Sequence, residues 1–136
     1  MYIMKLEHIG IAVKDLHQAN LCYEKLLGIA PYKMESVSSE GVNTSFFQTG
    51  ESKLELLEAT HFLSPIARFI DKKGEGIHHI AFEVTDIYSE IQRLKEEGFE
   101  FINEIPKQGA DNKLVCFVYP KNAHGVLIEL CQTIKD

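Results

Sequence analysis

Two short segments of the chain show the same alternation of apolar and polar or small positions. Residues 8–16 read His-Ile-Gly-Ile-Ala-Val-Lys-Asp-Leu, and 71 residues later residues 79–87 read His-Ile-Ala-Phe-Glu-Val-Thr-Asp-Ile. Successive side chains of a strand point to opposite faces, so each segment predicts a strand with one apolar face. Asp15 and Asp86 are suitable N-caps for a helix after each strand. Two copies of one unit therefore follow each other along the chain.

Three further strand-like runs follow each expected helix, and turn-forming residues separate them. The helices are expected to stop at Gly28 and Gly98, because glycine accepts the left-handed conformation that ends many helices. In sequence order the runs cover about residues 32–37, 42–48, 53–58, 100–104, 113–119 and 126–132. Each copy is thus predicted to have the order βαβββ.

A short helix is predicted between the two copies. Ser64 is a suitable N-cap, Pro65 suits the first helical position, and Gly74 suits the end. We therefore expect one α+β domain over residues 1–136. Its parts are module one (about 4–60), the connecting helix (about 64–73) and module two (about 76–133).

Composition and charge exclude several classes of protein. The 136 residues are 45% hydrophobic and 25% charged, which is typical of a folded domain. The net charge of −6 disfavours a nucleic-acid binder, which needs a basic face. The N-terminal residues lack the pattern of a signal peptide, and no apolar run approaches the roughly 20 residues of a membrane helix. We therefore expect a cytoplasmic protein with no nucleic-acid or membrane partner.

The cysteines Cys22, Cys116 and Cys131 are scattered along the chain without C-x-x-C spacing. A disulfide framework or a zinc knuckle is therefore not expected. The interpretation is that all three are buried, reduced thiols.

His8 and His79 occupy matching positions in the two expected strands. Each lies on the face opposite the bulky apolar residues, beside the small residues Gly10, Ala12 and Ala81, which leave a hollow there. A single histidine on a strand is usually structural, so the interpretation depends on the match between the copies. The other histidines are read as lying on the surface or on the opposite face: His17, His61, His78 and His124.

Glu55 and Glu129 also occupy matching positions, within Leu-Glu-Leu-Leu and Ile-Glu-Leu-Cys. Each faces away from its apolar neighbours, although a lone glutamate in such a run is usually solvent-facing. If the two modules pair about a pseudo-twofold axis, both carboxylates converge with the two histidines. Two imidazoles and two carboxylates suit a divalent ion, whose charge the carboxylates balance. The repeat therefore predicts a metal site formed by His8, Glu55, His79 and Glu129.

Paired βαβββ modules with such residues on their first and last strands resemble the vicinal-oxygen-chelate (glyoxalase-like) superfamily. Within it, the chain is similar to the methylmalonyl-CoA epimerases. The likeness covers nearly the whole chain and includes residues 7–13 and 125–130. It is most specific in Ser-Pro-Ile-Ala-Arg-Phe-Ile (64–70) and Gly-Glu-Gly-Ile-His-His (74–79). The resemblance implies that the two modules form a half-open barrel and that the protein is a homodimer.

The resemblance implies interconversion of the 2R and 2S epimers of methylmalonyl-CoA, an acyl-CoA substrate. The proton alpha to the thioester would be abstracted and returned through a metal-stabilised enolate. The ion expected first is Co²⁺, and Mn²⁺, Mg²⁺, Ni²⁺ or Zn²⁺ also suit the donors. The metal ligands of the family carry over to His8, Glu55, His79 and Glu129.

Glu129 and Glu55 are the hypothetical acid/base groups for the two faces of the reacting carbon, because they lie on different modules. Some relatives use a further glutamate in the strand that here covers about 42–48, where this chain has no carboxylate. Thr44 occupies that region and is a candidate substrate contact. Candidate contacts of the anionic CoA, with solvated surface residues as the alternative reading, are Arg68, Lys113 and Lys121.

Three other functions stay open on these residues. A glyoxalase I-type lactoylglutathione lyase can present the same ligands, whereas an extradiol dioxygenase uses two histidines and one carboxylate on Fe(II). Glu55, as a fourth ligand, argues against the dioxygenase. A non-catalytic small-molecule-binding protein of the resistance type needs no such ligand set, so metal content separates it. Fold alone does not decide among these functions.

Overall fold

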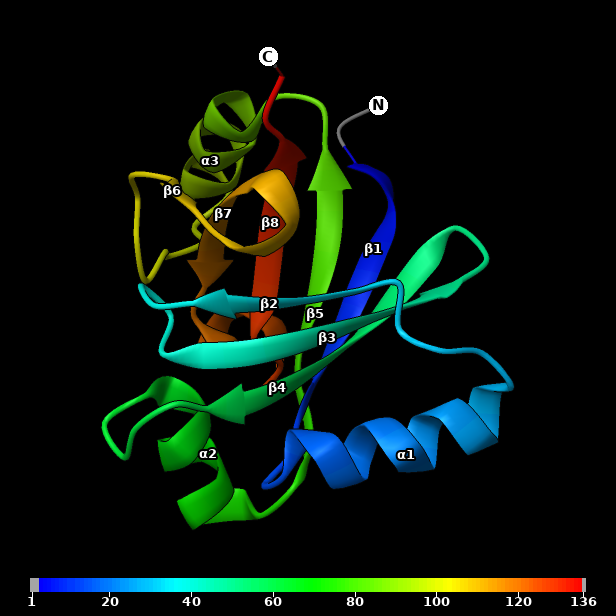
Figure 1. The fold of residues 1–136 in the computed structure, drawn as a ribbon. Helices are drawn as coiled ribbons and strands as arrows, with labels where there is room; N and C mark the ends of the chain where they lie inside the picture. Colours follow the sequence, from blue (N-terminus) through cyan, green and yellow to red (C-terminus); the bar gives the residue numbers. More distant parts are fainter. Residues whose placement is uncertain (1–2, 136) are drawn as a thin grey trace. The chain divides into compact units, whose positions relative to one another are not determined.

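A computed structural model describes residues 3–135 of the chain, which contain three α-helices and eight strands (Figure 1). The chain divides into two compact units, one formed by His8–His78 and the other by Met1–Glu7 with His79–Asp136. Among the described residues, no helix combines the length and the apolar character needed to cross a membrane.

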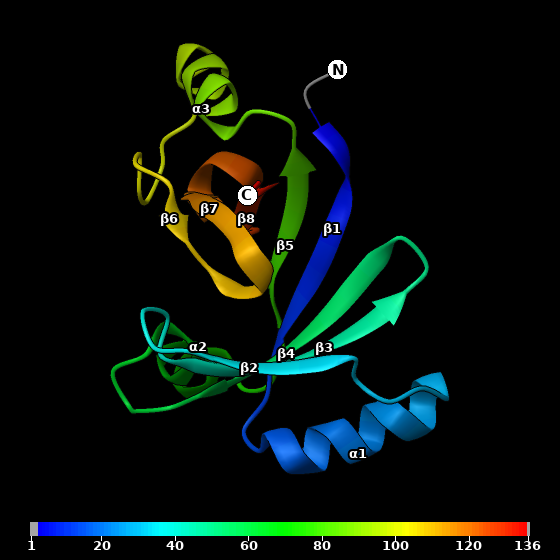
Figure 2. The same cartoon turned by 45° about the horizontal axis from the view of Figure 1, so that its top comes forward.

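The sheet of the first unit has the strand order β2-β3-β4-β1. β1 (Ile3–Ala12) and β4 (Ser52–Ala59) are parallel, while β3 (Val42–Thr49) pairs antiparallel with β4 and with β2 (Lys33–Val37). Figure 2 shows α1 (Leu16–Leu27) running along one side of β3 and β4. The buried core between helix and sheet consists of Val13, Leu16, Phe47 and Leu56.

The sheet of the second unit has the strand order β5-β8-β7-β6. β5 (Gly76–Val84) and β8 (Ile128–Thr133) are parallel, while β7 (Lys113–Val118) pairs antiparallel with β8 and with the short β6 (Lys107–Gln108). α3 (Ile87–Glu96) contacts β8. Each unit thus pairs its first and last strands in parallel. The buried core of the second unit consists of Val84, Ile87, Ile91, Phe101, Cys116, Val118 and Leu130.

The helices begin at the predicted capping residues. Asp15, Ser64 and Asp86 each accept a hydrogen bond from a backbone N–H in the first turn of α1, α2 (Pro65–Lys73) and α3. Such bonds satisfy donors that have no partner inside the helix. Gly28 ends α1 with a φ of 72°, in the left-handed region that favours glycine. The predicted helix boundaries are therefore confirmed at these positions.

The strand predicted at about 100–104 is wrong. Phe101 makes only an isolated bridge to β7, and the regular ladder begins later, at β6. Asn103 replaces the missing ladder: its side-chain oxygen accepts from the backbone N–H of Phe117 at 3.2 Å. Its amide group donates to the backbone carbonyl of Val115 at 3.3 Å. One side chain thus satisfies backbone groups that a neighbouring strand would otherwise satisfy.

Cys22 contradicts the expectation of three buried thiols. It is exposed on α1, whereas Cys116 and Cys131 are buried, and none of the three forms a disulfide. The helical periodicity turns this position of α1 away from the sheet. The three thiols therefore differ in access to solvent.

Asn103→Ala is expected to lower the free energy of unfolding by about 1–3 kcal/mol, because partly buried backbone groups of β7 lose their partner. Urea denaturation followed by circular dichroism measures the change. Gln92→Ala is the matched control, since its amide bonds Glu96 on the exposed surface of α3. The control is expected to stay within about 0.5 kcal/mol of the parent protein. Equal losses in both variants would contradict the role given to Asn103.

Candidate functional site

The parallel register of β1 and β4 brings His8 and Glu55 together. Gly10 of β1 lies opposite Glu55 of β4. His8 precedes Gly10 by two residues, so its side chain is on the face of the sheet that carries Glu55. Nδ1 of His8 is 3.0 Å from Oε2 of Glu55, and the side chains are 5% and 6% exposed. Because Gly10 has no side chain, the carboxylate has room beside it.

The second unit repeats this arrangement with His79 and Glu129. Ala81 lies opposite Glu129 in the parallel pairing of β5 and β8, and His79 precedes it by two residues. Nε2 of His79 is 3.2 Å from Oε1 of Glu129, and both side chains are buried. Phe117 of β7 lies opposite Glu129, and its ring meets the ring of His79 edge-on at 5.9 Å. An aromatic side chain therefore shields this pair from solvent on one side.

The two pairs offer donors that suit a metal ion. Each supplies an imidazole nitrogen and a carboxylate oxygen, and each belongs to a group of buried side chains whose ligand atoms lie close enough to hold an ion. Burial of a carboxylate is costly unless a cation or several hydrogen-bond donors compensate it. Mixed nitrogen and oxygen donors fit divalent transition metals, so the residues present are compatible with the metal that the sequence predicted.

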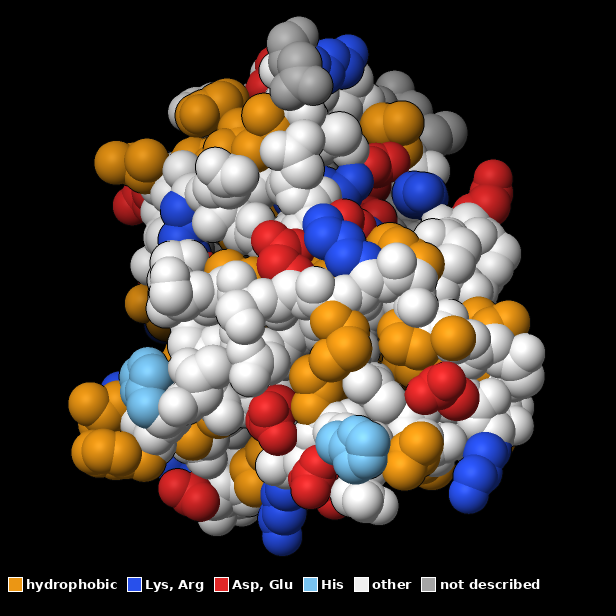
Figure 3. All heavy atoms as spheres, in the orientation of Figure 1, with side chains coloured by type: hydrophobic (Ala, Val, Ile, Leu, Met, Phe, Trp, Pro, Cys, Tyr) orange, Lys and Arg blue, Asp and Glu red, His pale blue; other side chains and the backbone are white. Residues whose placement is uncertain are grey.

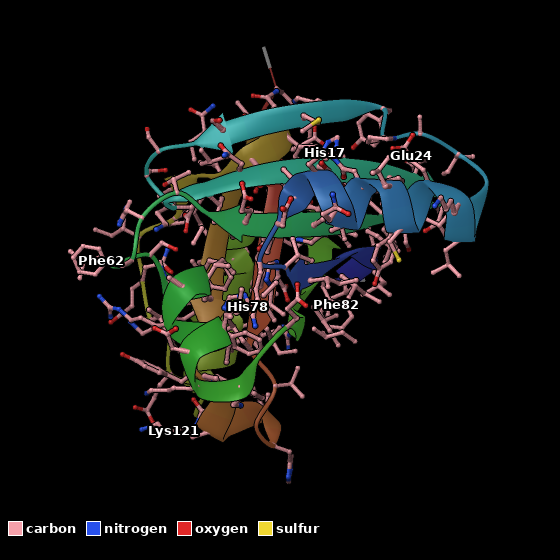
Figure 4. The ribbon with its side chains drawn as sticks, turned by 60° about the horizontal axis from the view of Figure 1, so that its bottom comes forward. His17, Glu24, Phe62, His78, Phe82 and Lys121 are labelled. Atoms are coloured by element: carbon pink, nitrogen blue, oxygen red, sulfur yellow. The ribbon has the colours of Figure 1, made fainter. Side chains whose placement is uncertain are left out.

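The remaining histidines take no part in these pairs. The ring of His78 lies edge-on to Phe69 of α2, with the ring centres 5.0 Å apart (Figure 4). His78 therefore faces the helix, as its place in the strand predicted. The other three are exposed, namely His17, His61 and His124.

Thr44 lies on the face of the first sheet that carries Glu55. Phe46 is opposite Glu55 in the pairing of β3 with β4, and Thr44, two residues earlier, points to the same side. Thr44 is 0% exposed, and its hydroxyl oxygen has no hydrogen-bond partner among the described residues. An unpaired buried hydroxyl is costly, so Thr44 is suited to bond a molecule that enters this face.

Glu35 is a carboxylate that the sequence analysis did not single out. It lies opposite Thr44 in the pairing of β2 with β3 and therefore shares its face. Its carboxylate oxygen lies 3.3 Å from Nζ of Lys33. No pattern along β2 marks Glu35, since only the register of the strands shows which face it occupies. β3 has no carboxylate, but the neighbouring strand β2 supplies one, Glu35, on the same face.

Lys113 is buried, so its interpretation as a solvated surface lysine is wrong. The residue is 9% exposed, and its Nζ lies 2.7 Å from Oγ1 of Thr133 and 3.2 Å from Oε1 of Glu83. Oε2 of Glu7 lies 3.8 Å from the same nitrogen. The hydroxyl of Thr133 in turn donates to Glu83 at 3.2 Å. This group of four side chains is called the Lys113 cluster below.

Lys121 and Arg68 are exposed. Lys121 lies in the 3-10 turn Pro120–Ala123 that follows β7, at the edge of the unit (Figure 4). Its Nζ is 3.3 Å from Oε2 of Glu100, and both side chains are more than half exposed. On the face drawn in Figure 3, acidic and basic side chains are mixed and form no continuous basic surface. That distribution agrees with the net charge of −6.

Burial raises the pKa of two cysteine thiols in the second unit. The pKa of Cys116 rises to about 12, mainly through burial and further through the charge of Glu129. Burial and the charge of Glu129 also raise the pKa of Cys131 far above its ordinary range, although Lys113 partly opposes them. Cys131 lies opposite Val115 in the pairing of β7 with β8. Both thiols are therefore protonated and uncharged at neutral pH.

The chain matches proteins of known family along most of its length. A family model for the Glyoxalase/Bleomycin resistance protein/Dioxygenase superfamily matches residues 7–117. Uncharacterized protein YqjC of Bacillus subtilis (strain 168) is 42% identical over 97% of this chain and 94% of its own length. The ethylmalonyl-CoA/methylmalonyl-CoA epimerase of Cereibacter sphaeroides is 40% identical over 96% of this chain and 98% of its own length.

A solved structure shows the same fold. A variant of Streptomyces coelicolor methylmalonyl-CoA epimerase, in complex with 2-nitronate-propionyl-CoA, is similar with a TM-score of 0.93 and 31% identity. The match covers 96% of this chain and 95% of that chain. The predicted fold class, an α+β glyoxalase-like fold of two βαβββ modules, is therefore confirmed.

Only Cys22 is expected to react rapidly with a thiol reagent such as dithionitrobenzoate in the native protein, because Cys116 and Cys131 are buried and protonated. Release of thionitrobenzoate is followed at neutral pH, before and after addition of guanidinium chloride. Cys22→Ser is the control and should remove the rapid phase. Rapid reaction of the remaining thiols in native Cys22→Ser would contradict this expectation.

Proposed function

The chain belongs to the glyoxalase/bleomycin resistance protein/dioxygenase superfamily. From its similarity to an epimerase of that fold, we propose that it interconverts the 2R and 2S epimers of methylmalonyl-CoA. The observation that carries the proposal is the buried His–Glu pair built in the same register in each unit. It occurs in a chain that is 40% identical to an epimerase over 96% of its length. Such an enzyme is an isomerase, because a proton leaves and returns to the same carbon.

We propose that both pairs together hold one divalent ion. The repeated construction, the burial of all four side chains and the small residues Gly10 and Ala81 support this assignment. When bound, the ion supplies a Lewis acid that stabilises negative charge developing on the thioester oxygen. Co²⁺ is expected first, with Mn²⁺, Mg²⁺, Ni²⁺ or Zn²⁺ compatible with the same donors. The proposed ligands are His8, Glu55, His79 and Glu129.

Glu129 and Glu55 are the proposed acid/base groups. Each is 5% exposed, so both carboxylates are held in place within the protein. His8 and His79 each lie within 3.2 Å of one oxygen of the neighbouring carboxylate and thereby orient it. Epimerisation needs a group on each face of the reacting carbon, and the two glutamates come from different modules.

Thr44 is the proposed substrate contact in the first unit, because its buried hydroxyl has bonding capacity that the described residues do not use. Lys121 and Arg68 are exposed and suit the anionic CoA. Lys113 suits it less, since its buried ammonium group already bonds Thr133 and Glu83 and pairs with Glu7. The homodimer, the organisation as one domain and the cytoplasmic location remain predictions.

With metal-loaded protein in heavy water, the alpha-proton NMR signal of racemic methylmalonyl-CoA is expected to disappear without net conversion to another compound. Protein treated with EDTA is the control and should exchange the proton much more slowly. Glu129→Gln is expected to slow exchange of at least one epimer by about 10²–10⁴-fold, because an amide cannot take up the proton.

The same measurement separates the alternatives. An absence of exchange with the metal-replete protein would overturn the proposed function. The glutathione hemithioacetal of methylglyoxal would then be tested, as the substrate of a lactoylglutathione lyase. If Glu129→Gln keeps full exchange of both epimers, the role of Glu129 as an acid/base group is wrong while the overall reaction stands.

Thr44→Val is expected to lower kcat/KM by roughly 2- to 10-fold through the loss of one hydrogen bond to the substrate. The free energy of unfolding should not fall, because the hydroxyl that is removed has no partner in the protein. Ser45→Ala is the matched control: its hydroxyl is equally buried and unpartnered among the described residues, but it faces α1. Equal kcat/KM values for the two variants would argue against the contact.

A further inference from the structure

Lys113 brings three strands together through one buried ammonium group. Its Nζ donates hydrogen bonds to Oγ1 of Thr133 on β8 and to Oε1 of Glu83 on β5, and it forms a longer ion pair with Oε2 of Glu7 on β1. The distances are 2.7, 3.2 and 3.8 Å. One buried ammonium group thus makes two hydrogen bonds and one ion pair, each to a different strand.

Each of these three strands also carries one of the proposed metal ligands. Glu7 directly precedes His8 in β1. His79 lies four residues before Glu83, and Glu129 lies four residues before Thr133. Side chains at positions i and i+4 of a strand lie on the same face. Glu83 therefore shares a face with His79, and Thr133 shares a face with Glu129. Lys113 itself starts β7, opposite Thr133.

We propose that Lys113 is a positioning residue of the metal site, an inference that rests on the proposed function. It does not contact the ion. It fixes Glu83 and Thr133, and through β5 and β8 it sets the distance between His79 and Glu129; through Glu7 it also holds the residue next to His8.

The electrostatics of the cluster favour this role over a purely local ion pair. Glu7 is 3% exposed and the side chain of Glu83 is 12% exposed, so both carboxylates are taken largely out of water. Without Lys113 these like charges would repel each other in a poorly screened place. The strands would then separate or take up water, and ligands must keep their geometry to within about 0.5 Å for tight binding.

The chain also offers variants that separate positioning from folding. Lys113→Met removes the charge and keeps much of the apolar stem, whereas Lys113→Arg keeps a charged donor. Lys95→Met is the matched control, because Lys95 pairs with Glu104 on the exposed surface of the same unit. Thr133→Val is a milder variant, which removes one acceptor and leaves every charge in place.

Binding of Co²⁺ to each substrate-free protein is measured by competition with a chromophoric chelator, and the visible absorption spectrum of the bound ion is recorded. We expect one ion per chain in the parent protein. Lys113→Met should bind Co²⁺ about 10–100-fold more weakly, as is usual when a group that orients ligands is lost. Its spectrum should change, whereas Lys113→Arg should restore most of the affinity and Lys95→Met should match the parent.

The outcomes distinguish this inference from the proposed function. If the parent protein binds no Co²⁺, the metal-dependent function is overturned, and the positioning role with it. If the parent binds one ion and Lys113→Met gives the same affinity and spectrum, only the positioning role is overturned. If Lys113→Met does not fold, Thr133→Val decides: a weaker affinity with an altered spectrum supports the role, and unchanged values overturn it.

Discussion

The parallel pairing of a histidine strand with a glutamate strand is the constraint on which the site depends. In each unit a very small residue, Gly10 or Ala81, lies opposite the glutamate, and the histidine two residues earlier reaches the carboxylate. A slip of one residue would turn the glutamate to the opposite face, into the apolar core against the helix. The apolar residues that alternate with the site residues form the core. Because they must stay buried, they also fix the register of the paired strands.

The second constraint is that buried charges need compensation, and the second unit provides it through Lys113. The carboxylates of Glu7 and Glu83 pair with the ammonium group of Lys113, and the carboxylate of Glu129 lies against the imidazole of His79. Cys131 stays uncharged, because burial and the nearby carboxylates raise its pKa.

The fold alone does not select the reaction, because members of this superfamily carry out different chemistry on the same scaffold. Under the proposed function, the polar side chains on the face of the sheet that carries the His–Glu pair would select the reaction. In the first unit this face presents the hydroxyl of Thr44 where β3 has no carboxylate, and Glu35 lies in the adjacent strand.

The sequence by itself determined the local structure and the matched site residues. Caps such as Asp15 act within one turn, strand faces follow from alternation, and a repeat places equivalent residues at equivalent positions. Only the tertiary structure decided the rest. Asn103 replaces an expected strand through bonds to β7, Lys113 is buried by acceptors from three distant strands, and Thr44 gains Glu35 as its neighbour. These features depend on which strands become neighbours and in which register, and no local pattern records that.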